Sequence, residues 1–130
     1  MSVFSFFRHA AARGFEAGRH DCGLWLADYA MAQMDIPDPC PELRGLDDAA
    51  WRSTANQLPR VVARVCRRIG AVRIEAVDAR SGDIGVIARH LTAPTGAIRD
   101  AVGWAQLTAT GVVVAPLLPG DRVLAVWRLP

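Results

Sequence analysis

The hydrophobic pattern of this chain changes its period once, and that change is the strongest constraint on its fold. Over about residues 1–70, apolar residues recur at intervals of three and four, which is typical of amphipathic helices. From Gly82 onward, short runs rich in Val, Ile and Trp are separated by turns that contain Gly, Pro and Thr, which is typical of strands. Helices followed by strands predict the α+β class, in which the helices pack on one face of a sheet.

Four helices are predicted in the helical half. The first carries an apolar stripe and is expected to end around Ala17–Gly18. Asp21 is expected to cap a second helix of roughly three turns by accepting a backbone N–H. Asp47 is expected to cap a short third helix that runs through Trp51. The fourth is predicted from Pro59, at its first turn, to Gly70, where it stops.

The sheet half, about residues 71–130, contains four strand-like runs. They are joined by short connections, which favour antiparallel pairing. We therefore expect a sheet of four or five antiparallel strands. At 130 residues the chain is long enough for one hydrophobic core and short for two, so residues 1–130 are expected to form a single domain. The four runs read GDIGVIA, AIRDAVGWAQL, GVVVAPL and RVLAVWRL.

Composition argues against several classes of function. The net charge of +2 is too small to indicate a nucleic-acid surface, and no apolar stretch approaches the roughly 20 residues of a spanning helix, so no membrane insertion is expected. Three cysteines without a Cys-x-x-Cys pair predict neither a disulfide framework nor a zinc site. The spacing of His20, Cys22 and Cys40 matches no recurring ligand pattern. We expect no metal, no cofactor, and folding in a reducing cytoplasm.

Cys22 raises the main chemical question, because it follows Asp21 at the start of the predicted second helix. A thiol in the first turn of a helix faces unpaired N–H groups and the positive end of the helix dipole, which stabilise a thiolate. The same N–H groups can stabilise an oxyanion. A buried, inert thiol at the same position is the alternative. Asp21 itself is explained most simply as a helix cap.

Two motifs resemble the NlpC-type cell-wall peptidases, a papain-like family that cleaves peptidoglycan stem peptides. HDCGLWLADYA resembles the Asp-Cys helix start of that family, and SGDIGVI resembles the Gly-Asp that opens its first sheet strand. The resemblance covers roughly residues 15–115. It implies a papain-like fold, with Cys22 at the position of the nucleophile, a catalytic histidine on the next strand and a further polar residue about one strand later.

A narrower resemblance spans nearly the whole chain. GRHDC…ADYA, DP…LRG, GDIGV and AVWRL are similar to a small uncharacterised family encoded among the tail genes of bacteriophages, prophages and gene-transfer particles. This resemblance implies a protein made in the host cytoplasm and carried in the virion tail. Its implied partners are other tail or baseplate proteins, with peptidoglycan as a further possible ligand.

The chain departs from the peptidase pattern at the base. Thr95 falls closest to the position of the histidine, and threonine cannot accept a proton near neutral pH. Gln106 falls where the orienting polar residue would lie. His20 and His90 are the candidate substitutes for the base, because a loop or a hairpin could bring either ring to the thiol. Each has a plainer interpretation, His20 as a partner of backbone carbonyls and His90 as a solvent-facing turn residue.

These observations leave functions of different classes open. The first is a structural component of a phage-type tail tip, a peptidase-like domain with a degenerate catalytic site. The second is an active cysteine hydrolase that cleaves peptidoglycan stem peptides during genome entry, with Cys22 as nucleophile and His20 or His90 as a relocated base. A cytoplasmic binding module unrelated to phage is a third. Whether the chain is an enzyme therefore depends on the surroundings of Cys22.

Overall fold

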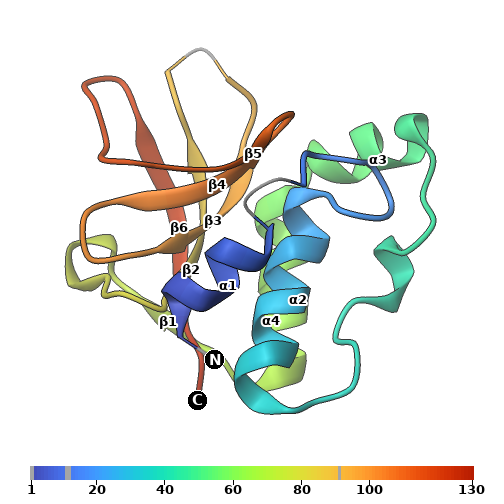
Figure 1. Ribbon diagram of the computed structural model, residues 1–130, viewed down its shortest axis with the longest axis horizontal. Helices are drawn as coiled ribbons and strands as arrows, with labels where there is room; N and C mark the ends of the chain where they lie inside the picture. Colours follow the sequence, from blue (N-terminus) through green and yellow to red (C-terminus); the bar gives the residue numbers. More distant parts are fainter. Residues whose placement is uncertain (1, 11–12, 91) are drawn as a thin grey trace.

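The computed structural model describes residues 2–10, 13–90 and 92–130, and it confirms the α+β class. Helices gather on one side and a single antiparallel sheet lies on the other (Figure 1). Within the described residues, no helix is long and apolar enough to cross a membrane. The helices are α1 (Val3–Ala10), α2 (Cys22–Met34), α3 (Asp48–Ala55) and α4 (Leu58–Ile69), with two short 3-10 turns, η1 (Pro41–Leu43) and η2 (Ala76–Asp78).

Local signals place the helix ends. Asp21 and Asp47 cap α2 and α3, each accepting a hydrogen bond from the backbone N–H three residues later at 2.8 Å. Pro59 lies in the first turn of α4, and Gly70 ends that helix with a φ of 76°, a left-handed conformation that glycine adopts without strain. The two caps, Pro59 and Gly70 are confirmed, while α3 extends beyond the expected end at Trp51 to Ala55. The expected end of the first helix at Ala17–Gly18 is wrong.

Residues 13–20 form a turn and not a continuation of α1. Residues 11 and 12 lie outside the described residues. After them, Glu16 and His20 form an isolated antiparallel bridge, closed by hydrogen bonds of 2.8 and 2.7 Å between their backbones. The Phe15 backbone N–H donates to the Thr108 carbonyl at 2.8 Å. The segment 13–20 is therefore bound to the end of β4, and the hydrogen bond between Phe15 and Thr108 replaces the helix that the apolar spacing of the segment favours.

Over the described residues the sheet has six strands in the order β1-β6-β2-β3-β4-β5, all antiparallel, where four or five were expected. The run 97–107 is broken into two strands because the Asp100 carboxylate accepts the backbone N–H groups of Val102 and Gly103, both at 2.8 Å. The additional edge strand, β1, has only three residues. The strands are β1 (Val72–Ile74), β2 (Ile84–Ala88), β3 (Thr95–Arg99), β4 (Trp104–Thr108), β5 (Gly111–Ala115) and β6 (Arg122–Arg128).

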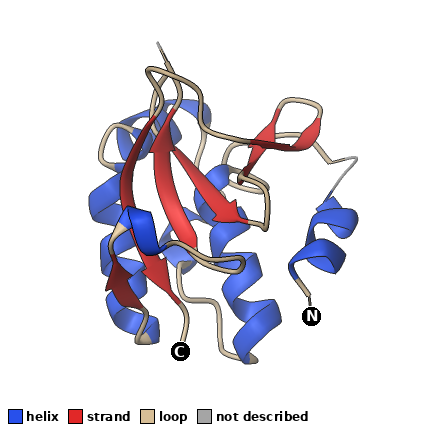
Figure 2. Cartoon of the chain, turned by 90° about the vertical axis from the view of Figure 1, so that its left-hand side faces the viewer, coloured by secondary structure: helices blue, strands red, loops and turns tan. Residues whose placement is uncertain are grey.

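Two hydrophobic clusters cover the two faces of the sheet. The larger one fills the space between the helices and the inner face, and its most deeply buried members include Leu24, Trp25 and Leu58. A smaller cluster on the other face joins Ile87, Trp104 and their neighbours. Figure 2 looks onto the sheet with the helices behind it. Because both faces are covered, every residue of β2 is buried.

The Gly-Asp motif at the start of β2 has a structural role. The Asp83 side chain is only 3% exposed, and its two oxygens accept hydrogen bonds from Nε and Nη2 of Arg128 at 2.9 and 2.7 Å. Its Oδ2 also accepts the backbone N–H of Arg80 at 2.8 Å. This paired carboxylate fastens the entrance of β2 to the end of β6.

Candidate functional site

The start of α2 is held by a carboxylate that is completely buried. Asp21 accepts the Leu24 backbone N–H with Oδ1 at 2.8 Å and the Gly18 backbone N–H with Oδ2 at 3.0 Å. Burial raises the pKa of this carboxyl, while those two N–H groups act in the opposite direction. Asp21 therefore joins the preceding turn to the first turn of α2 and fixes the position of Cys22.

Cys22 is covered by β3. Its residue is 5% exposed, and a Cβ atom on Gly96 would lie 2.7 Å from the Cys22 carbonyl oxygen and 2.9 Å from the Leu26 side chain. The glycine allows the strand to lie directly on the helix. Burial raises the pKa of the Cys22 thiol and outweighs the hydrogen bonds from the Gly96 backbone and the Thr95 side chain, which favour the thiolate. The thiol is therefore neutral near pH 7.

Thr95 occupies the place beside the sulfur where a base would be needed. It is the first residue of β3 and is half-buried, and its side chain is among the groups that lower the pKa of the Cys22 thiol against the effect of burial. Its Oγ1 also donates to the Gly96 carbonyl at 3.3 Å. A hydroxyl group can donate a hydrogen bond to sulfur, but it cannot take up a proton near neutral pH. The neighbour of the thiol is therefore not a general base.

The His20 ring forms no hydrogen bond with the Cys22 thiol among the described residues. The residue is 4% exposed, and among the described residues neither ring nitrogen has a hydrogen-bond partner. Burial lowers the pKa of this imidazole, and the charge of Arg13 lowers it further, against weaker opposing effects of Asp28, Glu16 and the Arg13 backbone. The ring is thus neutral near pH 7.

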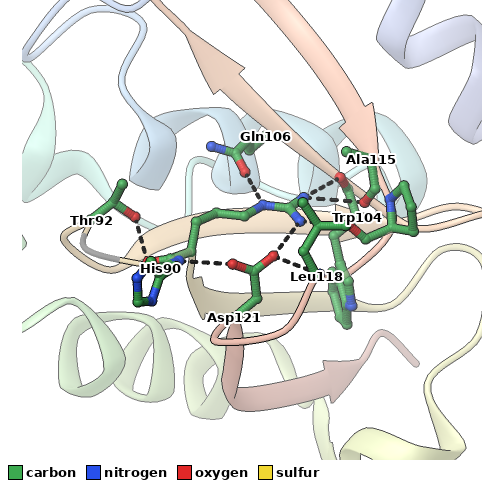
Figure 3. Close-up of polar contacts among 9 residues, drawn as sticks. His90, Thr92, Trp104, Gln106, Ala115, Leu118 and Asp121 are labelled. Carbon is green, nitrogen blue, oxygen red and sulfur yellow. Dashed lines mark hydrogen bonds and ion pairs between the residues drawn. The ribbon is translucent and has the colours of Figure 1, made fainter.

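His90 lies in the connection between β2 and β3 and is exposed. Its backbone N–H donates to Oδ1 of Asp121 at 2.8 Å, and its ring lies against Gly120, where an added Cβ would be 2.7 Å from Nδ1 (Figure 3). The ring therefore rests on the β5–β6 connection. Within the described residues, no hydrogen bond joins it to Cys22.

Gln106 has a partner that the sequence did not indicate. Its Oε1 accepts the Nε–H of Arg89 at 2.9 Å, so it orients no imidazole. The Arg89 guanidinium is 17% exposed and donates further to Oδ2 of Asp121 at 3.1 Å (Figure 3). Hydrogen bonds from the backbones of Leu118 and His90, and then from Arg89, lower the pKa of the Asp121 carboxyl. The Arg89 guanidinium also donates hydrogen bonds to the backbone carbonyls of Pro116, Ala115 and Trp104, at 2.8, 3.1 and 3.4 Å.

The Arg89 cluster is the principal polar feature that sequence reasoning missed. The guanidinium joins β2, β4 and the β5–β6 connection, and all its N–H directions are used. A partly buried arginine with this many fixed acceptors holds loops in place and leaves no donor for a ligand. The only available signal was an arginine at the end of an otherwise apolar strand, IGVIAR, which does not indicate its partners.

Among the described residues, Cys22 belongs to no cluster of metal-binding side chains and does not line the principal pockets. Within the described residues, no group of three or more His, Cys, Asp or Glu side chains is placed to hold a metal ion. An apolar cavity between α2 and α4, beside Cys40 and Cys66, has a volume of only about 20 Å³. Such a volume accommodates at most one water-sized molecule.

Together, the fold and the site define an α+β domain with a buried cysteine at a helix start and a threonine beside it. The chain belongs to the family described as "Domain of unknown function (DUF6950)", whose model matches residues 2–129. No curated protein and no solved structure matches it.

Proposed function

We propose that this chain is a non-catalytic structural component of a phage-type tail tip, built on a papain-like domain whose catalytic position is closed. The observation that carries the non-catalytic role is the Cys22 thiol, which is buried under β3 with Thr95 beside it. A cysteine hydrolase needs a thiolate, a base and a path for substrate. Here the thiol is neutral, the neighbour is a hydroxyl and β3 covers the sulfur.

The papain-like assignment is supported by the order of its parts. A helix that begins at a capped cysteine packs on the strand that follows the Gly-Asp motif by one hairpin, which is the arrangement implied by the NlpC-type resemblance. The assignment to a tail is supported by the narrower sequence resemblance. A domain without a working site acts by the surfaces it presents, and other tail or baseplate proteins are the proposed partners.

The test is the pH dependence of Cys22 alkylation by iodoacetamide, followed by mass spectrometry of the Cys22 peptide. Since Cys22, Cys40 and Cys66 are all buried, we expect slow reaction of the native chain from pH 6 to pH 9, and complete reaction after unfolding. Cys22→Ala is the blank. His20→Ala and His90→Ala should leave the slow rate unchanged if they remain folded by circular dichroism.

The opposite result would support the hydrolase. A Cys22 thiol that reacts rapidly well below pH 8, and slows when one histidine is removed, would require a Cys-His pair in solution and would overturn the proposal. The location is tested separately. Antibodies against the chain should label the tail end of particles from a producing host, and label confined to the cytoplasm would contradict the tail assignment.

A further inference from the structure

The two edges of the sheet differ in their protection against pairing. At one edge, β1 has three residues, and its central residue is Arg73, whose guanidinium lies 5.3 Å from the centre of the Trp127 ring. A short edge strand with a central charge resists the addition of another strand. At the other edge, β5 has five residues, GVVVA, and carries no charge.

The absence of charge extends well beyond β5. Residues 101–120 contain no Asp, Glu, Lys, Arg or His, so the whole β4–β5 hairpin and its flanks are uncharged. Val113 is 47% exposed and Val114 is 40% exposed, on opposite faces of the strand. Soluble proteins normally blunt such an edge with lysine, proline or a bulge. The β5 edge has none of these protective features, which indicates that another strand pairs with it.

The register of the hairpin shows which backbone groups are free. Thr108 and Gly111 flank a two-residue loop and pair with each other, so they form the closing hydrogen-bonded pair. Hydrogen bonds to β4 then recur at alternate residues, at Val113 and Ala115. The N–H and C=O groups of Val112 and Val114 therefore point away from β4, and no other strand among the described residues pairs with β5.

We propose that two copies of this chain associate through β5, in antiparallel pairing about a two-fold axis at Val113. In that register Val112 of one copy faces Val114 of the other, and every outward N–H and C=O of both residues gains a partner. The side chains that meet are valines, so identical copies meet without opposed like charges. This inference is independent of the chemistry of Cys22.

The association closes at two copies. The same five residues serve both partners, so the interface is isologous and the β5 edge of each copy is used up. Further growth would need the β1 edge, which Arg73 and its short length protect. The product is one continuous sheet of two six-stranded halves, in which β5 is no longer an edge.

The first experiment is sedimentation of the purified chain over a wide concentration range. The wild type should show a reversible equilibrium between monomer and dimer. Val114→Pro removes one outward N–H without touching the ladder to β4, and since each dimer loses two hydrogen bonds, the dissociation constant should rise about thirtyfold. Val77→Lys, at a 91% exposed position in η2, is the matched control and should leave the equilibrium unchanged.

Two further sets of variants test the register. Because Val113 faces its own copy, Val113→Lys and Val113→Glu should each weaken the dimer, and an equimolar mixture of the two should restore it. Val113→Cys should form an intermolecular disulfide when oxidised glutathione is added, the glutathione being reduced, because facing Cα atoms in such a pair lie about 4.5 Å apart. In the proposed register, residue 112 of one copy lies opposite residue 114 of the other. A mixture of the Val112→Cys and Val114→Cys variants should therefore cross-link, whereas neither variant should cross-link with itself.

Three results would overturn the proposal. One is a wild-type chain that stays monomeric at every concentration, which would leave the edge to a strand of a different protein. Another is a dimer that is indifferent to Val114→Pro in a variant that unfolds at the wild-type midpoint. The third is a dimer that Val77→Lys disrupts as strongly as Val113→Lys, which would place the interface elsewhere.

Discussion

Replacement of Arg89 by alanine tests whether the guanidinium cluster holds the far end of the sheet. The substitution removes the donor from five acceptors, including the Asp121 carboxylate, whose side chain is 4% exposed. Leaving a hydrogen-bonding group without its partner costs about 1–3 kcal/mol, and here several acceptors lose the same donor. Arg89 retains some contact with water, which replaces part of these bonds, so we place the total loss of unfolding free energy at about 3 kcal/mol.

The assay is urea unfolding followed by tryptophan fluorescence. With a denaturant slope of about 1.5 kcal/mol per molar, the midpoint should fall by about 2 M. Arg89→Lys keeps the charge, but an ammonium group cannot reach the carboxylate and the backbone carbonyls at the same time. The unfolding free energy of this variant should therefore lie between those of the wild type and Arg89→Ala. Arg122→Ala, an exposed neighbour in β6, is the control and should change stability by less than about 0.5 kcal/mol. A loss below about 1 kcal/mol for Arg89→Ala would refute the assigned role.

Two smaller predictions concern the surroundings of Cys22. The lowered pKa of His20 means that the folded chain resists a proton that the unfolded chain accepts, so stability is full above about pH 6.5 and declines below it, towards the folded pKa. His20→Gln should remove the loss of stability that His20 causes, as measured by urea titrations between pH 7 and pH 5. If the unfolding free energies of the wild type and of His20→Gln fell in parallel over this range, the prediction would be contradicted. Gly96→Ala should destabilise the chain by about 1–3 kcal/mol, because its Cβ would press on α2, and an unchanged thermal midpoint would show that β3 does not lie on Cys22.

The features that the sequence predicted correctly are those fixed by residues a few positions apart. A cap such as Asp21 or Asp47 acts three residues away, and Pro59 and Gly70 act on their own turns. The change of hydrophobic period likewise reports burial within each element, and so it gave the α+β class.

The features that it missed depend on contacts between distant parts of the chain. The helix dipole at Cys22 favours a thiolate, but β3, which lies far along the sequence, buries the sulfur and reverses the direction of the pKa shift. Gln106 was assigned by its spacing, yet its partner is Arg89 on another strand. The break at Asp100 depends on an Asx turn, a signal present in the sequence but hidden within an apolar run.

The order of the strands has a consequence for how the chain folds. β6 follows every other strand in the sequence, yet it lies inside the sheet, between β1 and β2 (Figure 1). During synthesis on a ribosome, β1 and β2 therefore remain unpaired on the sides that β6 will occupy. The hydrogen bonds from β6 to β1 and β2 can form only after β6 has emerged. Closure by a late, long-range strand is slow, so the sheet should complete its hydrogen-bonded ladder only after the whole of β6 has emerged.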